Sequence, residues 1–430
     1  MKINNKKTPP CLYNSKAVQT RDFFEKQYKK FMCNFIFNYL KGSAVKMDEK
    51  MTFDKSDSQA MKGVAILMML FHHCYYTEDR FEQYDVDFFP FGMQSAMDAA
   101  AFFKICVAIF VFISGYGIMV SMQKCGGSRL AERKNIAGRY ISLMSGYWFV
   151  YILSLIAVAA IKPSMYGVYN TRANPAAYVV NLLLDGLGLA NLFGTPTMNS
   201  TWWYMSLAII IVAVMPIFIE IYKRYGAISL LVICFFLRYA FTLKNFDMTR
   251  YFTILSLGII CADRNYLGRI KQKKWIKNGF FDYTLKLIVY TAVLYIMYYI
   301  RIRDRISGNI TEIRDGLVPL YVIFYCYTIL FPIKPLKKFL EFMGKHSMNI
   351  FLTHTFIRLY FFGDFIYSFK NAYLIVLVLW ATSLALALAI YGLQKLVKFD
   401  ELTAKFKQWV GKRIEYGMGQ KSKNTEAVSQ

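Results

Sequence analysis

Four histidines are present in the chain, and two of them are adjacent in a long apolar segment. His72 and His73 end the stretch Lys62-Gly-Val-Ala-Ile-Leu-Met-Met-Leu-Phe-His-His. In a helix, eleven residues at about 100° each return to within about 20° of the starting face, so Lys62 and His73 share a face about 16 Å apart. His72 points about a quarter turn away. An imidazole can act as a general base or accept an acyl group, although hydrogen-bonded packing explains both histidines equally well.

A second polar stripe runs through segment 344–358. Ser347, His354 and Arg358 are spaced by seven and four residues, which puts them on one face of a helix. Such a face either holds two helices together through hydrogen bonds or lines a polar cavity. Helix association is the better explanation for Ser347 alone. Ionisable groups in an apolar segment are costly, so His354 and Arg358 are candidate site residues.

Two further motifs accompany these stripes. Ser114 and Gly115, in the sequence Phe112-Ile-Ser-Gly-Tyr-Gly, are small residues that permit the close approach of another helix. Trp203, in the sequence Trp-Trp-Tyr, is typical of the aromatic belt at a membrane interface. Packing and interface anchoring are therefore the default roles of these residues.

All of these residues belong to an unusually apolar chain. Of its 430 residues, 56% are hydrophobic and 18% are charged, against about 25% charged in an average globular protein. Segment 373–393 contains no charged residue, and 205–222 contains one, Glu220. Apolar runs of about 18 or more residues predict membrane-spanning helices. The composition excludes a disordered or collagen-like chain and predicts an all-α, polytopic integral membrane protein.

Ten membrane spans are predicted, at about 60–77, 98–122, 140–161, 202–222, 227–243, 250–262, 280–301, 317–333, 347–366 and 372–396. An eleventh apolar stretch, 178–193, contains Asp185, two glycines and two asparagines, and we expect it to be re-entrant or interfacial. Lys104 and Lys286 lie six or seven residues inside their spans, and we expect their side chains to reach the membrane surface.

The loops between these spans are asymmetric in charge. With a cytoplasmic N-terminus, the inner segments carry 38 Lys or Arg residues and the outer segments carry 10. Cytoplasmic loops of membrane proteins collect positive charge, so we expect both termini in the cytoplasm. The same bias explains the net charge of +25 better than nucleic-acid binding does, because the basic residues are dispersed between apolar segments.

The chain divides into three parts. We expect residues 1–59 to be a basic cytoplasmic segment with an amphipathic helix at 24–39, lying on the membrane surface or packed against the protein. Residues 60–396 form the membrane domain, and 397–430 form a cytoplasmic tail that is disordered from Gly417. The eight cysteines have no CxxC spacing, so no metal site is predicted.

The order of these motifs resembles the acyltransferase-3 family, ten-span bacterial membrane proteins that O-acylate glycans of the cell envelope. The likeness covers about residues 56–396. Its landmarks are Lys62-Gly with His73, the segment from Phe112 to Tyr116, Arg139, Trp203 with Pro216, and Gly344-Lys with Ser347 and His354. The family usually has Arg where this chain has Lys62, so a bidentate phosphate contact becomes a point-charge contact.

The resemblance implies transfer of an acyl group, most simply acetyl, from cytoplasmic acyl-CoA to a hydroxyl of an extracytoplasmic glycan or lipid-linked sugar. Lys62 and Arg139 would contact the CoA phosphates, and His73 would be the general base or a transient acyl carrier. The residues implied to line the site are Ser114, Trp203, Ser347, His354 and Arg358. The implied location is the bacterial plasma membrane, with acyl-CoA as donor substrate and no bound cofactor.

Two other functions would use the same features. Cations inside a membrane also occur in transporters or flippases of small anions or lipid-linked glycans, although the sequence has no inverted repeat. A non-catalytic partner in a polysaccharide export complex is a third interpretation. Discharge of labelled acetyl-CoA by the purified protein would separate the enzyme from both.

Overall fold

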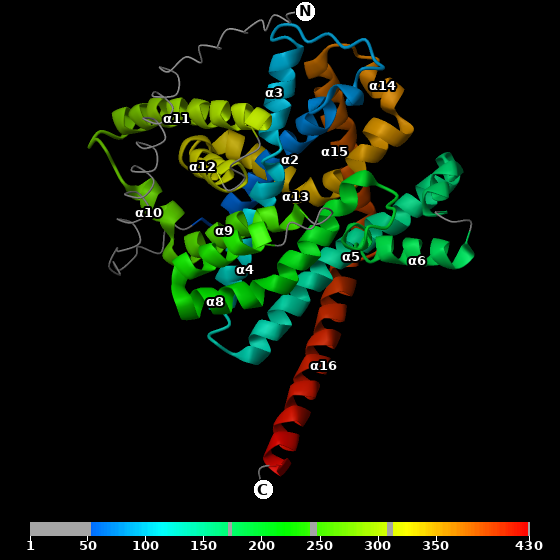
Figure 1. Cartoon of the computed structure of the whole chain (residues 1–430), viewed down its shortest axis with the longest axis vertical. Helices are drawn as coiled ribbons and strands as arrows, with labels where there is room; N and C mark the ends of the chain where they lie inside the picture. The colour runs from blue at the N-terminus through cyan, green and yellow to red at the C-terminus, as the bar shows by residue number, and fades with distance from the viewer. Residues whose placement is uncertain (1–52, 171–173, 241–246, 308–312, 429–430) are drawn as a thin grey trace, which may run out of the picture. The chain divides into compact units, whose positions relative to one another are not determined.

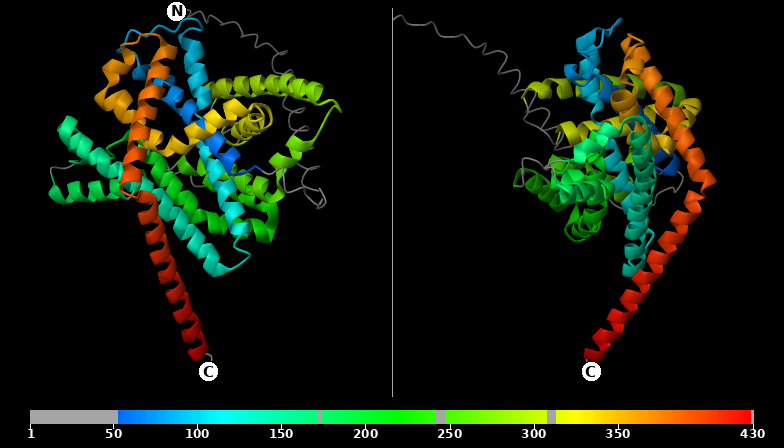
Figure 2. Two further views of the ribbon diagram at one scale, coloured as in Figure 1. Left: turned by 180° about the vertical axis from the view of Figure 1, so that it is seen from behind. Right: turned by 90° about the vertical axis from the view of Figure 1, so that its right-hand side faces the viewer.

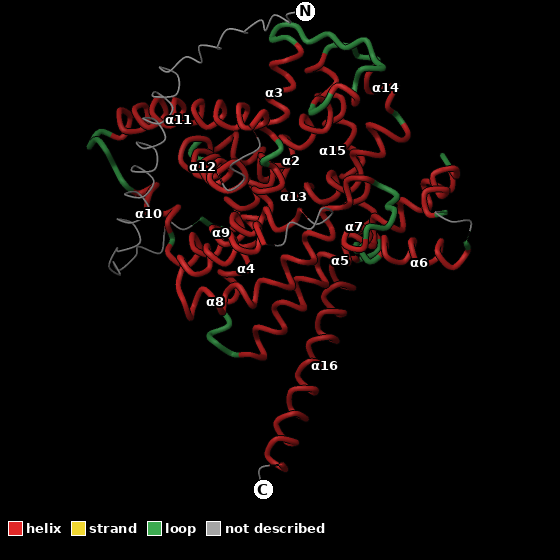
Figure 3. The backbone as a smooth tube through the Cα atoms, viewed as in Figure 1, coloured by secondary structure: helices red, strands yellow, loops and turns green. Residues whose placement is uncertain are grey.

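The computed structural model describes residues 53–170, 174–240, 247–307 and 313–428. The amphipathic helix predicted at 24–39 lies outside these residues. Within them the fold consists of helices and connecting loops, with no strand (Figures 1 and 3). The predicted all-α class is therefore confirmed for the described part of the chain.

The helices follow one another as α2 (Lys55–Tyr75), α3 (Met93–Phe103), α4 (Cys106–Gln123), α5 (Arg129–Ile161), α6 (Pro175–Gly186), α7 (Ala190–Phe193), α8 (Trp203–Ala240), α9 (Phe252–Arg264), α10 (Tyr266–Gln272), α11 (Gly279–Ser307), α12 (Val318–Tyr325), α13 (Lys334–Thr355), α14 (Gly363–Tyr367), α15 (Ala372–Leu396) and α16 (Phe399–Val428). Short turns between them are η1 (Glu78–Arg80), η2 (Pro163–Tyr169), η3 (Ser200–Trp202), η4 (Asp247–Tyr251), η5 (Ile313–Leu317), η6 (Cys326–Leu330) and η7 (Phe356–Phe361), and the last three are π-helical.

Each of the ten predicted spans lies mainly on helical structure. Within the residues that the structure describes, five helical stretches are long and apolar enough to cross a membrane: Met93–Gln123, Arg129–Ile161, Ser200–Tyr239, Gly279–Ile302 and Ala372–Leu396. Segment 178–193 instead forms parts of α6 and α7, which have 12 and 4 residues. Both are much shorter than the roughly 20 residues that a crossing requires.

Two predicted boundaries differ from the structure. The predicted span at 98–122 is interrupted where Lys104 and Ile105 separate α3 from α4. The spans predicted at 202–222 and 227–243 are joined in α8, with a break at Gly226. The φ of Gly226 is 84°, a left-handed conformation that glycine adopts without steric cost.

Helices α2 and α13 pack against each other backbone to backbone (Figures 1 and 2). A Cβ atom on Gly63 would lie 2.0 Å from the carbonyl oxygen of Leu340, and one on Gly344 would lie 1.9 Å from the carbonyl oxygen of Gln59. Glycine alone lets two helix backbones approach this closely. The two glycines therefore set both the distance and the register between α2 and α13.

Polar contacts fix the N-terminal ends of the same two helices. Asp54 caps α2 in a reciprocal capping box with Asp57. The Lys337 ammonium on α13 lies 2.7 Å from the Asp57 carboxylate, and Ser56 donates a hydrogen bond to Glu341. The start of α2 is thus tied to α13 one turn before Lys62.

A second glycine pair joins α4 to α9. A Cβ on Gly115 would lie 2.5 Å from the Leu255 carbonyl oxygen, and one on Gly258 would lie 2.6 Å from the Phe112 carbonyl oxygen. Close helix approach at Gly115 agrees with the packing role that the sequence predicts for this motif. The Gln123 amide at the end of α4 donates to the Asp263 carboxylate near the end of α9, at 3.0 Å, so the two helices run parallel.

Helix α16 packs on α5 and then extends away from it (Figure 2). Its Glu415 carboxylate lies 2.9 Å from the Lys134 ammonium on α5. The structure continues α16 to Val428, whereas the sequence predicts disorder from Gly417. A helix that tertiary contacts have already nucleated extends at little further cost, which accounts for the difference.

Candidate active site

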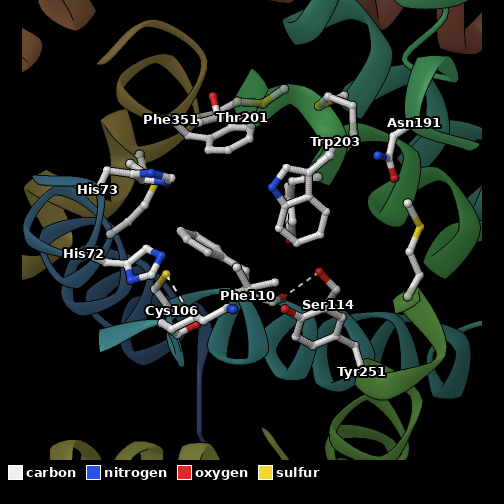
Figure 4. A pocket seen from close by; sticks show the side chains of 18 of the residues that line it. His72, His73, Cys106, Phe110, Ser114, Asn191, Thr201, Trp203, Tyr251 and Phe351 are labelled. Carbon is white, nitrogen blue, oxygen red and sulfur yellow. Dashed lines mark hydrogen bonds between the residues drawn. The ribbon is translucent and has the colours of Figure 1, made fainter. Parts of the chain in front are cut away.

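A cavity of about 570 Å³ lies between α2, α4, α8 and α13 (Figure 4). This volume is within the range of small-molecule sites. Its apolar and aromatic wall consists of Met69, Val107, Phe110, Leu143, Tyr204, Met205, Met248, Tyr251, Met348 and Phe351. Its polar residues are Lys62, His72, His73, Tyr76, Arg80, Lys104, Cys106, Ser114, Asn191, Thr201, Trp203, Arg250 and Ser347.

His73 on α2 and His354 on α13 face each other beside this cavity. Their ring centroids are 4.9 Å apart, with an angle of 45° between the ring planes. Each histidine follows its helix-contact glycine, Gly63 or Gly344, by ten residues. The two helices run parallel and touch at those glycines. Residues ten positions later on each helix therefore lie at the same height, which brings the two imidazoles together.

His354 is completely buried, and both of its ring nitrogens are engaged. Nδ1 lies 2.8 Å from the Phe351 carbonyl oxygen and 3.2 Å from that of Ile350. Since carbonyl oxygens only accept, Nδ1 carries the proton, and Nε2 accepts from the Thr355 hydroxyl at 3.1 Å. His354 thus has no nitrogen left to accept a proton from a substrate.

His73 differs from its neighbours in being open to the cavity. Its side chain is half-buried, and no hydrogen bond holds its ring nitrogens among the residues that the structure describes. His72, by contrast, is buried and its Nδ1 lies 2.8 Å from the Ala100 carbonyl oxygen. Figure 4 shows the His73 ring on one side of the cavity and Trp203 on the other.

The end of α2 that carries His73 is held by Arg80. The guanidinium of Arg80 donates to the carbonyl oxygens of His72, at 2.9 Å, and His73, at 3.2 Å. These carbonyls belong to the last turn of α2, where the His72 carbonyl oxygen also accepts from the Tyr76 N–H at 3.2 Å. Arg80 therefore fixes the backbone from which the His73 side chain projects.

Lys62 and Arg139 are placed differently. Lys62 lines the cavity near the start of α2, as predicted from the stripe that it shares with His73. The Arg139 guanidinium does not reach the cavity surface, because it donates to the Gly117 carbonyl oxygen at 2.6 Å and to Ser121 at 2.8 Å. It remains a charged neighbour of Lys62 and ties α5 to α4.

Ser114, Trp203 and Ser347 line the cavity. Ser114 donates its hydroxyl proton to the Phe110 carbonyl oxygen one turn earlier, at 2.9 Å. The Trp203 ring stacks on Tyr251 at a centroid distance of 6.4 Å and an angle of 22°. No hydrogen bond to the Trp203 indole nitrogen occurs within the described part of the chain, so its N–H is available to a ligand.

Arg358 lies away from the cavity surface, which differs from its predicted place beside Ser347. Helix α13 ends at Thr355 and continues as the π-helical turn η7, whose wider spacing shifts the register of the following residues. Arg358 is buried there, with Nη1 3.5 Å from the Tyr367 hydroxyl. Its Nε has no partner among the described residues.

Three basic residues line the cavity without having been predicted as site residues: Arg80, Lys104 and Arg250. Lys104 does not extend along a continuous helix to the membrane surface, because α3 ends just before it and its ammonium lies 4.8 Å above the Tyr76 ring. Arg80 and Arg250 come from predicted outer loops far apart in the chain. Basic residues are uncommon in outer loops, so their presence there was the one feature of the sequence that could have marked Arg80 and Arg250 as candidate site residues.

Arg250 is held by a carboxylate outside the predicted spans. Asp315 lies 2.6 Å from Arg250, 3.3 Å from Arg301 and 3.6 Å from Arg314. Burial alone would raise the pKa of Asp315, but the three arginines hold that pKa below its usual range. The carboxylate is therefore ionised and neutralises one of the three cations.

Residues 56–392 match the sequence model of the acyltransferase-3 family, which is described as an acyltransferase domain. No curated protein matches the chain, and no solved structure does.

Proposed function

Because this chain belongs to the acyltransferase-3 family, we propose that it is a membrane O-acyltransferase of the bacterial cell envelope. Its donor is cytoplasmic acyl-CoA, with acetyl as the transferred group. Its acceptor is a hydroxyl of an extracytoplasmic glycan. The family match supports acyl transfer as such, and the arrangement of the cavity supports the assignment of donor and acceptor sides.

The contrast between His73 and His354 is the observation that carries this proposal. His73 presents an imidazole without a hydrogen-bond partner among the described residues to the cavity, whereas both nitrogens of His354 are occupied. The acceptor hydroxyl gives its proton to His73 while its oxygen attacks the thioester carbon. The carbon–sulfur bond then breaks, and His73 returns the proton to the CoA sulfur. His354 packs against His73 and limits the movement of its ring.

The remaining wall of the cavity suits the same step. The indole N–H of Trp203 lies across the cavity from His73, where it can donate to the oxyanion that forms on the thioester carbonyl. The aromatic wall, including Phe110, Tyr204 and Phe351, excludes water and so limits hydrolysis of the thioester.

The purified protein tests this reaction directly. Incubation with radiolabelled acetyl-CoA and a crude lipid-linked glycan extract is expected to release free CoA and to label the glycan. A transporter or flippase with the same cavity would leave the thioester intact. Labelling of the glycan without any CoA release would also contradict the proposal, because the acetyl group would then have another source.

Lys62 is expected to contribute to binding of the donor. Lys62→Ala should raise the KM for acetyl-CoA about tenfold, because a charge-assisted hydrogen bond to a phosphate is lost. Lys62→Arg should keep the KM at or below its original value, since a guanidinium binds phosphate at least as well. Initial rates over a range of acetyl-CoA concentrations measure both effects.

Lys274→Ala is the matched control for loss of positive charge. Lys274 is exposed, lies in a predicted cytoplasmic loop and does not line the cavity. Its removal should leave the KM unchanged. An unchanged KM in Lys62→Ala would remove Lys62 from the donor site.

The proposed direction of transfer requires ten spans with both termini in the cytoplasm. In a background without native cysteines, a cysteine at Lys273 should be shielded from membrane-impermeant maleimide in intact cells, and one at Asp85 should be labelled. The charge bias of 38 inner against 10 outer basic residues supports this orientation. External labelling at position 273 would instead make 178–193 a membrane crossing and invert the second half of the chain.

A further inference from the structure

A second group of basic residues lines the cavity beyond His73, at the end of α2 opposite Lys62. Arg80 and Lys104 both lie over the Tyr76 ring, with the Arg80 guanidinium carbon 5.4 Å and the Lys104 ammonium 4.8 Å from its centroid. Arg250 completes the group on the cavity wall. We call Arg80, Lys104 and Arg250 the distal basic group.

Two members of the distal basic group, Arg80 and Lys104, are poorly neutralised by the residues that the structure describes. Among the described residues, no carboxylate forms an ion pair with Arg80 or Lys104, and the flanking Glu78 and Asp79 are exposed to solvent. Arg250 does pair with a carboxylate, Asp315, which also contacts Arg301 and Arg314. Asp315 forms no ion pair with Arg80 or Lys104, so among the described residues no paired carboxylate balances the charges of these two side chains.

Such an excess of positive charge at a half-buried surface is costly without a counter-charge. The protein contacts of Lys104 are the Tyr76 hydroxyl, at 3.4 Å, and the Tyr76 ring, neither of which is charged. An ammonium group has three donors, so capacity remains for a ligand. An oxyanion would satisfy it and Arg80 together through charge-assisted hydrogen bonds.

The donor does not reach this group in the proposed arrangement. Lys62 and His73 are about 16 Å apart along α2, and Arg80 lies beyond His73. An acyl-CoA with its phosphates at Lys62 and its thioester at His73 occupies the part of the cavity before Arg80. The distal basic group is then left for the second substrate.

We propose that the distal basic group binds a phosphate or carboxylate group of the acceptor, so that the acceptor is an anionic sugar. The term acceptor rests on the proposed function, whereas anion binding at this place does not. The anion would lie next to His73, because Arg80 also donates to the His73 carbonyl oxygen. The Arg80 side chain would thus position both the acceptor, through its anion, and the backbone of His73, through the carbonyl oxygen.

Equilibrium binding to the purified full-length protein tests the proposal with four radiolabelled probes. Glucose 1-phosphate represents a sugar phosphate, glucuronate a sugar carboxylate, methyl glucoside an uncharged sugar, and CoA the donor. At least one anionic sugar is expected to bind more tightly than methyl glucoside. Which of the two binds distinguishes a phosphate-bearing from a carboxylate-bearing acceptor.

Two variants then separate the ends of the cavity. Lys104→Gln is expected to weaken binding of the anionic sugar about tenfold and to leave CoA binding unchanged, whereas Lys62→Gln should do the reverse. Lys104→Arg should restore sugar binding because it keeps the charge. Arg80→Gln is a second variant of the same group and is expected to follow Lys104→Gln if the latter does not accumulate.

The outcomes distinguish this proposal from the proposed function. Equal binding of charged and uncharged sugars overturns the anion site, and so does a loss of CoA affinity in Lys104→Gln, which would assign the group to the donor. If sugar binding behaves as expected but acetyl-CoA is not discharged, the acyltransferase assignment fails while the anion site stands.

Discussion

Replacement of His73 by alanine is expected to lower the rate of acyl transfer by about 10²- to 10⁴-fold, the contribution of a positioned general base. The variant should still fold, because His73 faces a cavity and makes no hydrogen bond to the described residues through its ring. Single-turnover release of CoA from acetyl-CoA, measured with acceptor present, gives the rate. Residual activity would come from positioning of the substrates and from the oxyanion contact.

The control for this variant is His346→Ala. His346 is a buried histidine of α13 whose ring packs against Phe342 and Tyr391 and does not line the cavity. It should keep the full rate. His72→Ala should lose less activity than His73→Ala, because the His72 Nδ1 is already bound to the Ala100 carbonyl. Equal losses in the His73 and His346 variants would show that the effect is structural.

Incubation of the protein with labelled acetyl-CoA in the absence of acceptor separates the two roles that His73 can play. If His73 carries the acyl group on its ring, labelled acetyl-CoA without acceptor should leave a hydroxylamine-sensitive label on the protein that is absent from His73→Ala. If His73 acts as a general base alone, no such label should form. Both results are compatible with loss of transfer in the variant.

The second large effect is expected at the contact between α2 and α13. Gly344→Ala should destabilise the protein by about 3 kcal/mol or prevent its accumulation, since overpacking a close contact costs about 1–3 kcal/mol and sometimes more. The added Cβ would lie 1.9 Å from a backbone oxygen, and no side-chain rotation can relieve that clash. Any helix separation would also move His354 away from His73. The Tm of the detergent-purified protein measures the loss.

Gly138 on α5 and Gly392 on α15 offer matched controls. Nothing lies within 4 Å of a Cβ at either position, and both glycines are inside helices. Alanine at either position is expected to leave the free energy of unfolding unchanged or to raise it by up to about 1 kcal/mol, so the Tm should stay the same or rise. A Tm for Gly344→Ala equal to that of the two controls would mean that α2 and α13 do not pack at Gly344.

The sequence predicts the faces of helices well but not which helices meet. The spacing of Lys62 and His73 predicts that both lie on one stripe of α2, and both residues line the cavity. The same reasoning could not pair His73 with His354, because that contact depends on the two glycines that sit ten residues before them. The family resemblance implied that His73 and His354 belong to one site, but it did not reveal the glycine contact that brings them together.

Local departures from the ideal helix explain the remaining differences. Arg358 lies in the π-helical turn that follows Thr355, and it does not line the cavity although it is a charged neighbour of His354. Lys104 reached the cavity because the helix breaks beside it, between α3 and α4. A period of 3.6 residues cannot reveal either irregularity. Arg80 and Arg250 were missed because loops bring them together from distant parts of the chain.

The basic residues at the two ends of the cavity also bear on the permeability of the membrane. A path that lets an acyl group pass between two aqueous phases is also a potential leak for protons and sodium ions. Fixed cations at constrictions exclude such ions electrostatically, as they do in water channels. Lys62 lines the cavity near the start of α2, and Arg80, Lys104 and Arg250 line it near the other end of that helix, so fixed cations would meet such ions on both sides of His73. The arrangement that binds anionic substrates would thereby preserve the electrochemical gradient of the cell.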